Sequence, residues 1–330
     1  MGLSAHPRFR LAALPTPLQF AERLTAELGG PKIFLKRDDL TGLAMGGNKT
    51  RKLEYLVADA LAKGATHLIT VGAAQSNHAR QTAAAARMAG LGCHLVLNAA
   101  TEEPDVQGNL LLDKLLGAEV HIVTDGSQRQ AKVDEVAADL ADNGGVPYPI
   151  PVGGSNGIGS LGYVAAMLEL AEQLWSNDLA PKAMYFAAGS GGTQGGIVVG
   201  AHQHGLDFTL NAVLVEGKSA DGIARAEEVA GWAASELGVA APPHELFVAD
   251  DGHVGEGYGI PTEEGIEAIS LLARTEAVLL DPVYTSKAFA GMVADIRAGM
   301  YSPDDSVIFL HTGGSPALFA QRELLKSVLG

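Results

Sequence analysis

The first residue whose type and position could do chemistry is Lys49. It lies in the segment Gly46-Gly-Asn-Lys-Thr-Arg-Lys52, directly before an apolar pattern that predicts a helix. At a helix start the positive end of the helix dipole disfavours an ammonium group, and the cations of Arg51 and Lys52 act in the same direction. A lysine with a free amine can form a Schiff base with a carbonyl compound. The competing interpretation is a basic first turn that faces solvent, the more common position of a lysine.

Polar residues at a second helix start predict an anion-binding site. The segment Gln75-Ser-Asn-His78 follows an apolar run and precedes an Ala-rich helix. Unpaired backbone N–H groups at such a position, together with the Ser76, Asn77 and His78 side chains, can bind a carboxylate or a phosphate. The alternative is ordinary capping of the helix by Ser76 or Asn77, with His78 on the surface.

A glycine-rich loop predicts a phosphate site. The apolar run Met184 to Ala188 leads into Gly189-Ser-Gly-Gly-Thr-Gln-Gly-Gly196, and a helix is expected to begin near Ile197. Glycines allow backbone N–H groups to close around an anion, while Ser190 and Thr193 add hydroxyl donors. The loop lacks the Gly-Lys-Ser/Thr ending of a nucleotide P-loop, so nucleoside triphosphate binding is not expected. A tight strand-to-helix turn is the alternative.

Two shorter patterns match motifs of other enzyme classes. Ser155 occupies the centre of a G-x-S-x-G sequence, the pattern of a serine hydrolase. Gly157, Gly159 and Gly162 match the dinucleotide fingerprint of an NAD-dependent oxidoreductase. Both motifs require a buried strand directly upstream, whereas the prolines in the segment 147–151 are incompatible with a central strand. We therefore keep these two functions only as alternatives.

The histidines and the single cysteine give no expected metal site. His202 and His204 are two residues apart on an expected helix and therefore do not share a face. Cys93 is the only cysteine, so neither an internal disulfide nor a cysteine-based zinc site can form within the chain. We accordingly expect no metal ligands and a reducing, cytoplasmic location.

Tyrosines and hydroxyl residues in the C-terminal third are further candidates for a binding site. They occur in Gly255-Glu-Gly-Tyr-Gly-Ile-Pro261, Asp281-Pro-Val-Tyr-Thr285 and His311-Thr-Gly-Gly-Ser-Pro316. For each tyrosine, a packed ring with a hydrogen-bonded phenol is the alternative to a role in chemistry.

The elements that must position these residues alternate along the chain, as in a parallel α/β fold. Runs rich in Val, Ile and Leu predict strands at residues 33–36, 67–71, 94–97, 120–123, 184–187, 210–215 and 306–310. Apolar residues three and four apart predict helices at residues 53–61, 79–88, 108–116, 161–174, 266–272 and 286–298. The Gly- and Pro-rich segment 143–159 is the best candidate for a boundary between domains.

The composition favours a globular enzyme over a nucleic-acid or membrane protein. The chain has 330 residues, of which 47% are hydrophobic, and this is enough for one large core or two modest ones. Its formal charge of -15 would repel phosphate backbones and anionic lipid headgroups. The N-terminal segment lacks the apolar run of a signal peptide, and no apolar run reaches the roughly 20 residues of a membrane-spanning helix. We expect neither nucleic acid nor a membrane as a partner.

Taken in order, the motifs closely resemble those of the D-cysteine desulfhydrase and 1-aminocyclopropane-1-carboxylate (ACC) deaminase family of fold-type II pyridoxal phosphate (PLP) enzymes. The resemblance covers nearly the whole chain and is based on Lys-Arg-Asp-Asp-Leu-Thr-Gly, Gly-Gly-Asn-Lys-Thr-Arg-Lys, Gln-Ser-Asn-His, the glycine-rich loop, Gly-Tyr-Gly-Ile-Pro and Leu-Asp-Pro-Val-Tyr. It implies two three-layer α/β domains with mostly parallel sheets. The small domain would span residues 50–160, and residues 1–49 and 161–330 would form the large PLP-binding domain. Relatives of this type are usually dimers, so a homodimer is expected.

The resemblance also implies a role for each candidate residue. Lys49 would carry PLP as a Schiff base, and Asn77 would bond the phenolic oxygen of the cofactor. Ser76 and His78 would receive the carboxylate of a small amino-acid substrate. The other expected residues are Tyr258 and Tyr284 near the substrate, Gly189, Ser190, Gly191, Gly192 and Thr193 around the phosphate, and Thr285 and Thr312 near the pyridine nitrogen.

One departure from the deaminase branch bears on the reaction. Deaminases that open the cyclopropane ring resemble one another in having Tyr-Glu after Asp-Pro-Val, whereas this chain has Tyr284-Thr285. A hydroxyl cannot keep the pyridine nitrogen protonated as a carboxylate does, and the weaker electron sink suits β-elimination. We therefore expect a β-elimination lyase that converts D-cysteine to pyruvate, ammonia and sulfide. Lys49 or a tyrosine phenol would be the general base.

The same residues leave related activities open. These are an L-cysteate sulfo-lyase, a D-serine or β-chloroalanine eliminase, an ACC deaminase and an inactive PLP-binding protein. A sulfonate leaving group would require a nearby cation, for which Arg51, Lys52 and His253 are the candidates.

Overall fold

A computed structural model describes residues 2–321 of the chain and confirms the expected α/β class. The strands are β1 Leu18–Phe20, β2 Lys32–Lys36, β3 His67–Ala73, β4 Gly92–Asn98, β5 Glu119–Val123, β6 Pro147–Ile150, β7 Ala183–Ala188, β8 Thr209–Leu214, β9 Val248–Asp250 and β10 Ser306–Leu310. The α-helices are α1 Glu22–Leu28, α2 Lys49–Ala62, α3 Asn77–Ala89, α4 Gly108–Leu115, α5 Arg129–Asp142, α6 Gly157–Ser176, α7 Gly192–His204, α8 Ser219–Leu237, α9 Glu263–Glu276, α10 Thr285–Arg297 and α11 Pro316–Ala320.

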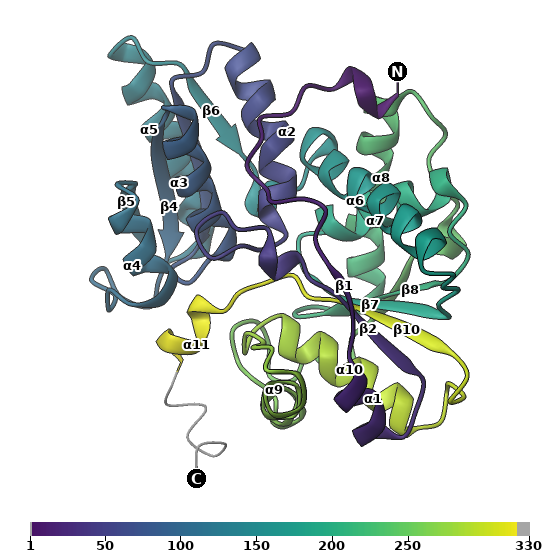
Figure 1. Cartoon of the computed structure of the whole chain (residues 1–330). Coiled ribbons are helices and arrows are strands. Elements are labelled where there is room, and N and C mark those ends of the chain that lie inside the picture. The colour runs from purple at the N-terminus through teal and green to yellow at the C-terminus, as the bar shows by residue number, and fades with distance from the viewer. Residues whose placement is uncertain (1, 322–330) are drawn as a thin grey trace.

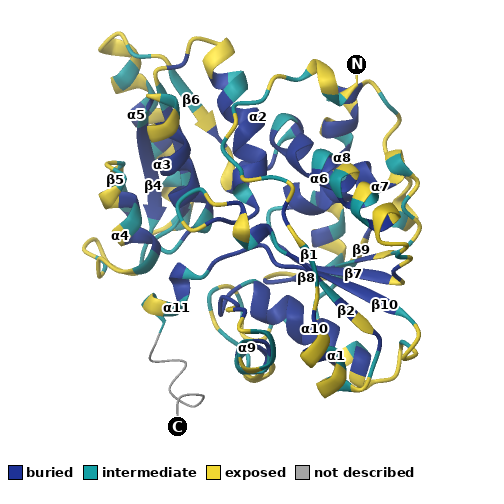
Figure 2. Cartoon of the chain, viewed as in Figure 1, coloured by how far each residue is buried: buried dark blue, intermediate teal, exposed yellow. Residues whose placement is uncertain are grey.

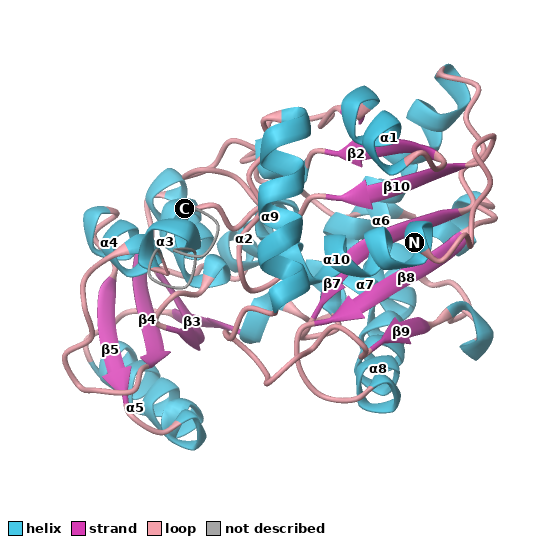
Figure 3. Cartoon of the chain, turned by 90° about the horizontal axis from the view of Figure 1, so that it is seen from below, coloured by secondary structure: helices cyan, strands magenta, loops and turns pink. Residues whose placement is uncertain are grey.

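The strands form two separate sheets, which Figure 1 and, from below, Figure 3 show side by side. The larger sheet has the order β1-β2-β10-β7-β8-β9, and the smaller sheet has the order β5-β4-β3-β6. Every neighbouring pair is parallel except the antiparallel pair of β1 and β2. Parallel strands require crossover connections, and helices provide most of them.

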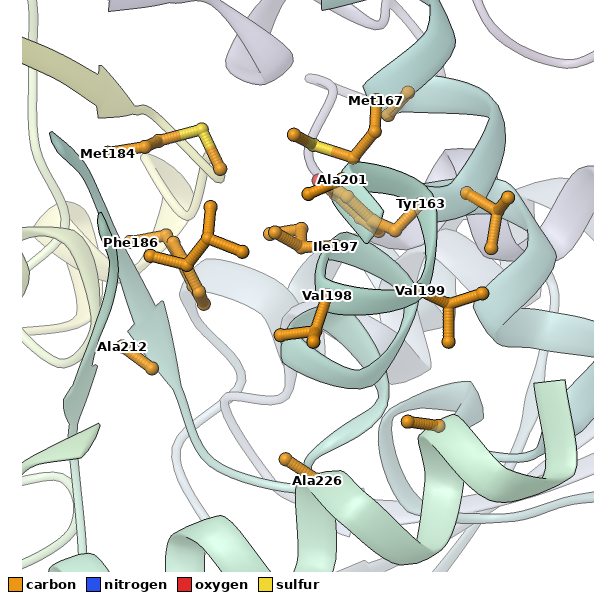
Figure 4. Packing of buried hydrophobic residues seen from close by; sticks show 14 of the residues in the cluster. Tyr163, Met167, Met184, Phe186, Ile197, Val198, Val199, Ala201, Ala212 and Ala226 are labelled. Carbon is orange, nitrogen blue, oxygen red and sulfur yellow. The ribbon is translucent and has the colours of Figure 1, made fainter. Parts of the chain in front are cut away.

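Helices cover both faces of the larger sheet. Helices α6, α7 and α8 lie on one face, and α1, α9 and α10 lie on the other (Figure 1). In the core between the larger sheet and helices α6, α7 and α8, Met184 and Phe186 of β7 face Ile197 and Val198 of α7 (Figure 4). The central strands β7 and β10 are buried along their whole length (Figure 2). Burial on both faces explains why these strands are continuous apolar runs in the sequence.

The smaller sheet is also covered on both faces. Helices α2 and α3 pack on one face, while α5 packs on the other through Val133 and Val136. Strand β6 was not among the expected strands because of its prolines, and this omission was wrong. It lies at the edge of the sheet and pairs with β3. Pro147 and Pro149 have no backbone N–H, which an edge strand tolerates because it has no second neighbouring strand to bond.

Helix α7 begins five residues earlier than the sequence suggested, at Gly192 instead of Ile197. Its glycines permit close contact with the two helices beside it. A Cβ on Gly196 would lie 2.4 Å from the carbonyl oxygen of Ser160 in α6, and a Cβ on Gly195 would lie 3.0 Å from that of Ala226 in α8. Gly195 and Gly196 are therefore needed for helix packing and not for anion binding.

A buried ion network fixes α2 against the larger sheet. Arg51 is 2% exposed, and its Nε donates to Asp38 Oδ2 at 2.8 Å while Nη2 donates to Glu169 Oε1 at 2.8 Å. Tyr163 donates its phenolic proton to Asp38 at 2.6 Å. Burial opposes the charge of Arg51, but the Asp38 carboxylate outweighs it and raises the pKa of Arg51 well above its usual value. Because Arg51 is paired in this way, it anchors the helix that carries Lys49.

The strands of the smaller sheet all lie between residues 67 and 150. We propose that the domain boundaries follow this division, with residues 50–160 as the small domain and residues 1–49 and 161–330 as the large one. Helix α2 joins the two, since it packs on α3 in the small domain and on α6 in the large one. Within residues 2–321, no helix combines the length and apolar character that crossing a bilayer would require.

Candidate active site

A cavity of about 570 Å³ lies at the carboxyl ends of strands from both sheets. Its wall includes Ala73 of β3, Asn98 of β4 and Ala188 of β7, each the last residue of its strand. Ligands of open α/β folds bind at this end of the strands, and the volume suits a cofactor with a small substrate. Of the expected site residues, the cavity brings together Lys49, Ser76, Asn77, His78, Gly189, Ser190, Gly191, Thr193, Tyr258, Tyr284 and Thr312. Gly192 and Thr285 do not line it.

Lys49 is the first residue of α2 and lines the cavity. Burial lowers the pKa of its ammonium group to about 8. Burial is the cause of this shift, and the charge of Arg51 is paired with Asp38. Lys52 does not itself line the cavity, and its Nζ donates to the carbonyl oxygen of the lining residue Gly153 at 3.1 Å.

The loop between β7 and α7 forms a cradle with the geometry of an anion site. Gly191 has φ +82°, and a Cβ there would lie 2.9 Å from the carbonyl oxygen of Arg225. Two hydroxyls border the loop: Ser190 Oγ lies 2.8 Å from Ser155 Oγ, and Thr193 Oγ1 accepts from Asn48 Nδ2 at 3.1 Å. Helix α7 follows directly, so its first N–H groups and its dipole favour a negative charge at this position.

Arg225 of α8 adds a positive charge to the cradle. It lines the cavity, and its Nε donates to the carbonyl oxygen of Gly189 at 3.3 Å. Its Nη2 atom is buried and has no hydrogen-bond partner within residues 2–321. A buried guanidinium nitrogen without a partner is costly unless an anion binds it, so the cradle fits the phosphate of PLP.

The start of α3 forms the opposite wall. Ser76 is the N-cap residue, and its Oγ accepts from the N–H of Ala79 at 3.1 Å. Ser76 therefore both caps α3 and lines the cavity. Asn109 Nδ2 donates to Asn77 Oδ1 at 2.9 Å, which orients the amide NH2 of Asn77 as a donor for another group. A phenolic oxygen is an acceptor that this donor suits.

The His78 side chain does not have the role expected for it. The hydroxyl proton of Thr70 goes to the carbonyl oxygen of Ile150 at 2.9 Å, so His78 Nε2, 2.9 Å from Thr70 Oγ1, carries a proton and donates. Burial, with the nearby charges of Lys49 and Lys52, lowers the pKa of His78 well below its usual value. The ring is therefore neutral, and Nδ1 has a lone pair that cannot donate to a carboxylate. The backbone N–H of His78 remains as a donor at the helix start.

Two tyrosine hydroxyls meet at the cavity. Tyr258 OH lies 2.7 Å from Tyr284 OH, and the rings make an edge-on contact with centroids 5.8 Å apart. Burial raises the pKa of both phenols, that of Tyr284 well above its usual value because the Tyr258 phenol adds to the effect. Both phenols are protonated at neutral pH, so they are proton donors.

Thr312 lines the cavity, whereas the hydroxyl of Thr285 donates to Asp281 Oδ2 at 2.8 Å and accepts from the N–H of Asp281 at 2.7 Å. The two carboxylate oxygens of Asp281 also accept from the N–H groups of Val283, Tyr284 and Thr285 at 2.8 to 3.0 Å. This loop therefore caps α10, and the Asp281 carboxylate accepts its hydrogen bonds from the residues that directly follow it in the chain.

The alternative motifs have other roles. Ser155 Oγ bonds Ser190 and accepts from the N–H of Gly192 at 3.2 Å, so it supports the anion cradle. Gly159 and Gly162 allow close packing, since a Cβ at either position would lie 2.2 and 2.4 Å from the carbonyl oxygens of Gly154 and Arg51, respectively. Both motifs are therefore explained by hydrogen bonding and close packing at these positions.

Several lining residues were not among the site residues expected from the sequence, although three of them lie within the motifs quoted above. They are Asn48, Arg129, Gln194, Glu216, Arg225 and Asp281. The asparagine stands next to the reactive lysine and could have been inferred from that position. The arginines lie on helices distant in sequence from the motifs, and only the fold brings them to the cavity.

The reactive lysine, the anion cradle and the amide donor together define a PLP-binding enzyme of the fold-type II class. The family described as "Pyridoxal-phosphate dependent enzyme" matches residues 9–313, and the chain belongs to this family. A protein of Klebsiella pneumoniae subsp. pneumoniae named D-cysteine desulfhydrase is 43% identical over 323 residues, which is 97% of each chain. A solved structure described as that of an ACC deaminase homologue has 38% identity and a TM-score of 0.91, covering 99% of this chain and 97% of its own. These findings confirm the expected family, fold class and cofactor.

Proposed function

We propose that the enzyme is a β-elimination lyase that converts D-cysteine and water to pyruvate, ammonia and hydrogen sulfide. The observation that carries this proposal is that Lys49, residues 189–191 and 193 of the cradle and the start of α3 line one cavity. These are the groups required to hold a PLP ring, its phosphate and an amino-acid carboxylate. The 43% identity to a protein named D-cysteine desulfhydrase supports the choice of substrate.

The cofactor would be held from three sides. Lys49 would bind its carbonyl carbon through Nζ, and the loop at residues 189–193 with Arg225 would bind its phosphate. Asn77, oriented by Asn109, would donate to its phenolic oxygen. When bound, PLP withdraws electrons from the substrate Cα and so weakens the Cα–H bond. Thr312 lines the cavity and would face the pyridine nitrogen, whereas Thr285 would act indirectly by fixing the Asp281 loop.

The substrate carboxylate would bind at the start of α3. The Ser76 hydroxyl and the backbone N–H groups of Asn77 and His78 are the donors there, and the helix dipole favours the anion. This contact fixes the direction of the Cα–H bond, which is how orientation contributes to rate.

Proton transfers would be divided between the lysine and the tyrosines. Lys49 Nζ removes the Cα proton, because its lowered pKa provides the free amine. The raised pKa values of Tyr258 and Tyr284 keep their phenols protonated, so they donate to the departing sulfur and are not the base. The C–S bond breaks, sulfide leaves, and the released aminoacrylate is hydrolysed to pyruvate and ammonia.

L-cysteate is the second candidate substrate, and a specific observation favours it. Arg129 at the start of α5 lines the cavity and acts on Tyr258 as a nearby positive charge. A sulfonate requires such a cation, and Arg129 replaces Arg51, Lys52 and His253, none of which lines the cavity. D-serine, β-chloroalanine and ACC remain comparison substrates.

The test is a substrate panel with the purified holoenzyme. Pyruvate is measured for D-cysteine, L-cysteine, L-cysteate, D-serine, β-chloroalanine and ACC, with sulfide or sulfite measured in parallel. The proposal expects the highest kcat/KM and equal amounts of pyruvate and sulfide with D-cysteine. Sulfite release from L-cysteate at a higher kcat/KM would overturn the substrate, and the absence of pyruvate from every compound would overturn lyase activity.

We also propose that the enzyme is a cytoplasmic homodimer. Its single cysteine, Cys93, is buried and has a pKa raised to about 12 by burial, which fits a protein without disulfides. Size-exclusion chromatography with light scattering should give twice the chain mass of 34.1 kDa. A mass of one chain at micromolar concentration would contradict the dimer.

A further inference from the structure

Two histidines and a glutamate gather on the smaller sheet, at a distance along the strands from the PLP cavity. His94 of β4 stands opposite Glu119 of β5 in the parallel register, and Val96 stands opposite His121. Residues two apart on a strand share a face, so all three side chains project from the face that α5 covers. The cavity lies at the carboxyl ends of these strands, and none of the three residues lines it.

The ligand atoms of this cluster lie within 4.8 Å of one another, close enough to surround one ion. His94 Nδ1 lies 3.3 Å from His121 Nε2 and 3.6 Å from Glu119 Oε2, while His121 Nε2 lies 3.6 Å from Glu119 Oε1. Zinc bonds of about 2.0 to 2.2 Å in a tetrahedron place neighbouring ligand atoms about 3.3 to 3.6 Å apart. The separation of the two nitrogens falls in this range. Each nitrogen faces a different oxygen of Glu119, so a rotation of this exposed side chain, without movement of the strands, would bring one oxygen toward both.

The surroundings hold the histidines and leave the carboxylate free to move. The side chains of His94 and His121 are 11% and 18% exposed, and their rings stack with centroids 5.6 Å apart at 14°. The Glu119 side chain is 66% exposed, so an ion can enter from solvent beside it. Lys132 and Glu135 of α5 lie near His121, but they form an ion pair with each other at 2.6 Å, which leaves little net charge.

A third histidine flanks the cluster without joining it. The ring of His67 in β3 lies 5.5 Å from that of His94, and its Nδ1 bonds Thr66 Oγ1 at 2.8 Å. His67 therefore supports the packing of His94, and the ligand set consists of two imidazoles and one carboxylate.

We propose that His94 Nδ1, His121 Nε2 and a Glu119 carboxylate oxygen form a binding site for Zn²⁺, with water at the fourth position. Two imidazoles and a carboxylate favour zinc over calcium or magnesium, which prefer sets of oxygen ligands. The ion would join the edge strand β5 to β4 and stabilise the small domain. This site is separate from the proposed lyase activity and runs against the expectation of no metal ligands.

The experiment is equilibrium dialysis of the metal-stripped holoenzyme against Zn²⁺ in substrate-free buffer, with bound zinc measured by mass spectrometry. We expect about one Zn²⁺ per chain at this site, and His121→Ala should weaken binding at least about tenfold, equivalent to about 1.4 kcal/mol. Glu119→Gln, at an exposed side chain, removes the anionic ligand with little risk to folding and should weaken binding as well. The matched control is His202→Ala, which removes an exposed histidine of α7 and should leave binding unchanged.

A second readout is the melting temperature of the same proteins. Zinc should raise it for the wild type and for His202→Ala, and should not raise it for His121→Ala or Glu119→Gln. Equal zinc affinity in wild type, His121→Ala and Glu119→Gln would overturn the site. So would the absence of zinc binding by the wild type, which would leave a hydrogen bond between His94 and His121 as the role of the pair.

Discussion

The hydroxyl of Tyr258, in the loop after β9, lies 2.7 Å from the hydroxyl of Tyr284, the residue before α10. The two segments are 26 residues apart in sequence and meet at the wall of the PLP cavity. Only one of the two protons can lie between the oxygens, so the other phenol keeps its proton for the substrate. The pair can therefore donate one phenolic proton to the substrate while the other proton is shared between the two oxygens.

Replacing either tyrosine of this pair with phenylalanine should reduce turnover. Loss of a positioned proton donor typically costs about 10² to 10⁴ in rate, so Tyr284→Phe and Tyr258→Phe should lower kcat in that range. The KM for the amino acid should change less, because the carboxylate site on α3 is intact. Tyr301→Phe, which removes a phenol outside the cavity, is the control and should keep kcat within about twofold of the wild type. Unchanged kcat in both cavity variants would contradict the donor role.

Attachment of PLP to the apoenzyme should depend on pH through Lys49. Only the neutral amine attacks the carbonyl of PLP, and burial lowers the pKa of this lysine to about 8. The attachment rate should therefore rise with pH and reach half of its maximum near pH 8, as followed by the growth of the visible absorption band. A rate that continues to rise toward pH 10.5, the ordinary value for lysine, would show that Lys49 is not buried as described.

Arg225 should control the affinity for the cofactor. Its unpartnered Nη2 is available to the phosphate, and a hydrogen bond between charged groups contributes about 1.5 to 3 kcal/mol. Arg225→Gln should therefore raise the Kd of PLP about 10- to 100-fold, measured by titration of the apoenzyme. Arg274→Gln, on the exposed surface of α9, is the matched control and should bind PLP as the wild type does. Equal affinities would show that the phosphate does not contact Arg225.

The stability of the small domain should depend on pH through Asp113 in α4. Burial raises the pKa of this carboxyl from 3.8 to about 8, despite the opposing charge of Arg80, and neither oxygen has a hydrogen-bond partner within the described residues. The native carboxyl keeps its proton in a range where the unfolded one has lost it. Its contribution to stability is therefore complete below pH 3.8 and is lost as the pH rises toward 8.

Asp113→Asn removes this titration while keeping the shape of the side chain. The variant should melt at a higher temperature than the wild type at pH 8, by about 2 °C or more, and the difference should shrink at pH 5. Differential scanning calorimetry at both pH values measures this. A difference between the proteins that is equal at pH 5 and pH 8 would show that Asp113 is ionised in both states.

The sequence predicted the core strands well because burial on both faces gives continuous apolar runs, as in β7 and β10. It did not predict β1 and β9, which are only three residues long and lie at the edges of the larger sheet. Strand β6 was missed because its prolines are incompatible with a central strand, whereas β6 is an edge strand. These errors share one cause, since edge strands obtain their conformation from the neighbouring strand more than from their own residues.

The candidate site was predictable where its residues lie in contiguous motifs. Lys49, the loop at residues 189–193 and the start of α3 each have a local signal in glycines, hydroxyls or a helix start. Arg225 and Asn109 have no such signal, because their roles depend on tertiary contacts with Gly189 and Asn77. The orientation of His78 toward Thr70 was equally hidden, since a helix start does not specify which way a side chain turns.

The role of Lys49 as the lysine that binds PLP can be tested directly. The holoenzyme is reduced with borohydride, digested, and searched by mass spectrometry for the peptide that carries the reduced cofactor. Lys52, a buried lysine one helical turn away on α2, provides an internal comparison. We predict that the modification is on Lys49 alone and that Lys49→Ala has neither the modified peptide nor turnover. Modification of Lys52 or of another lysine in the wild type, with Lys49 unmodified, would contradict the account.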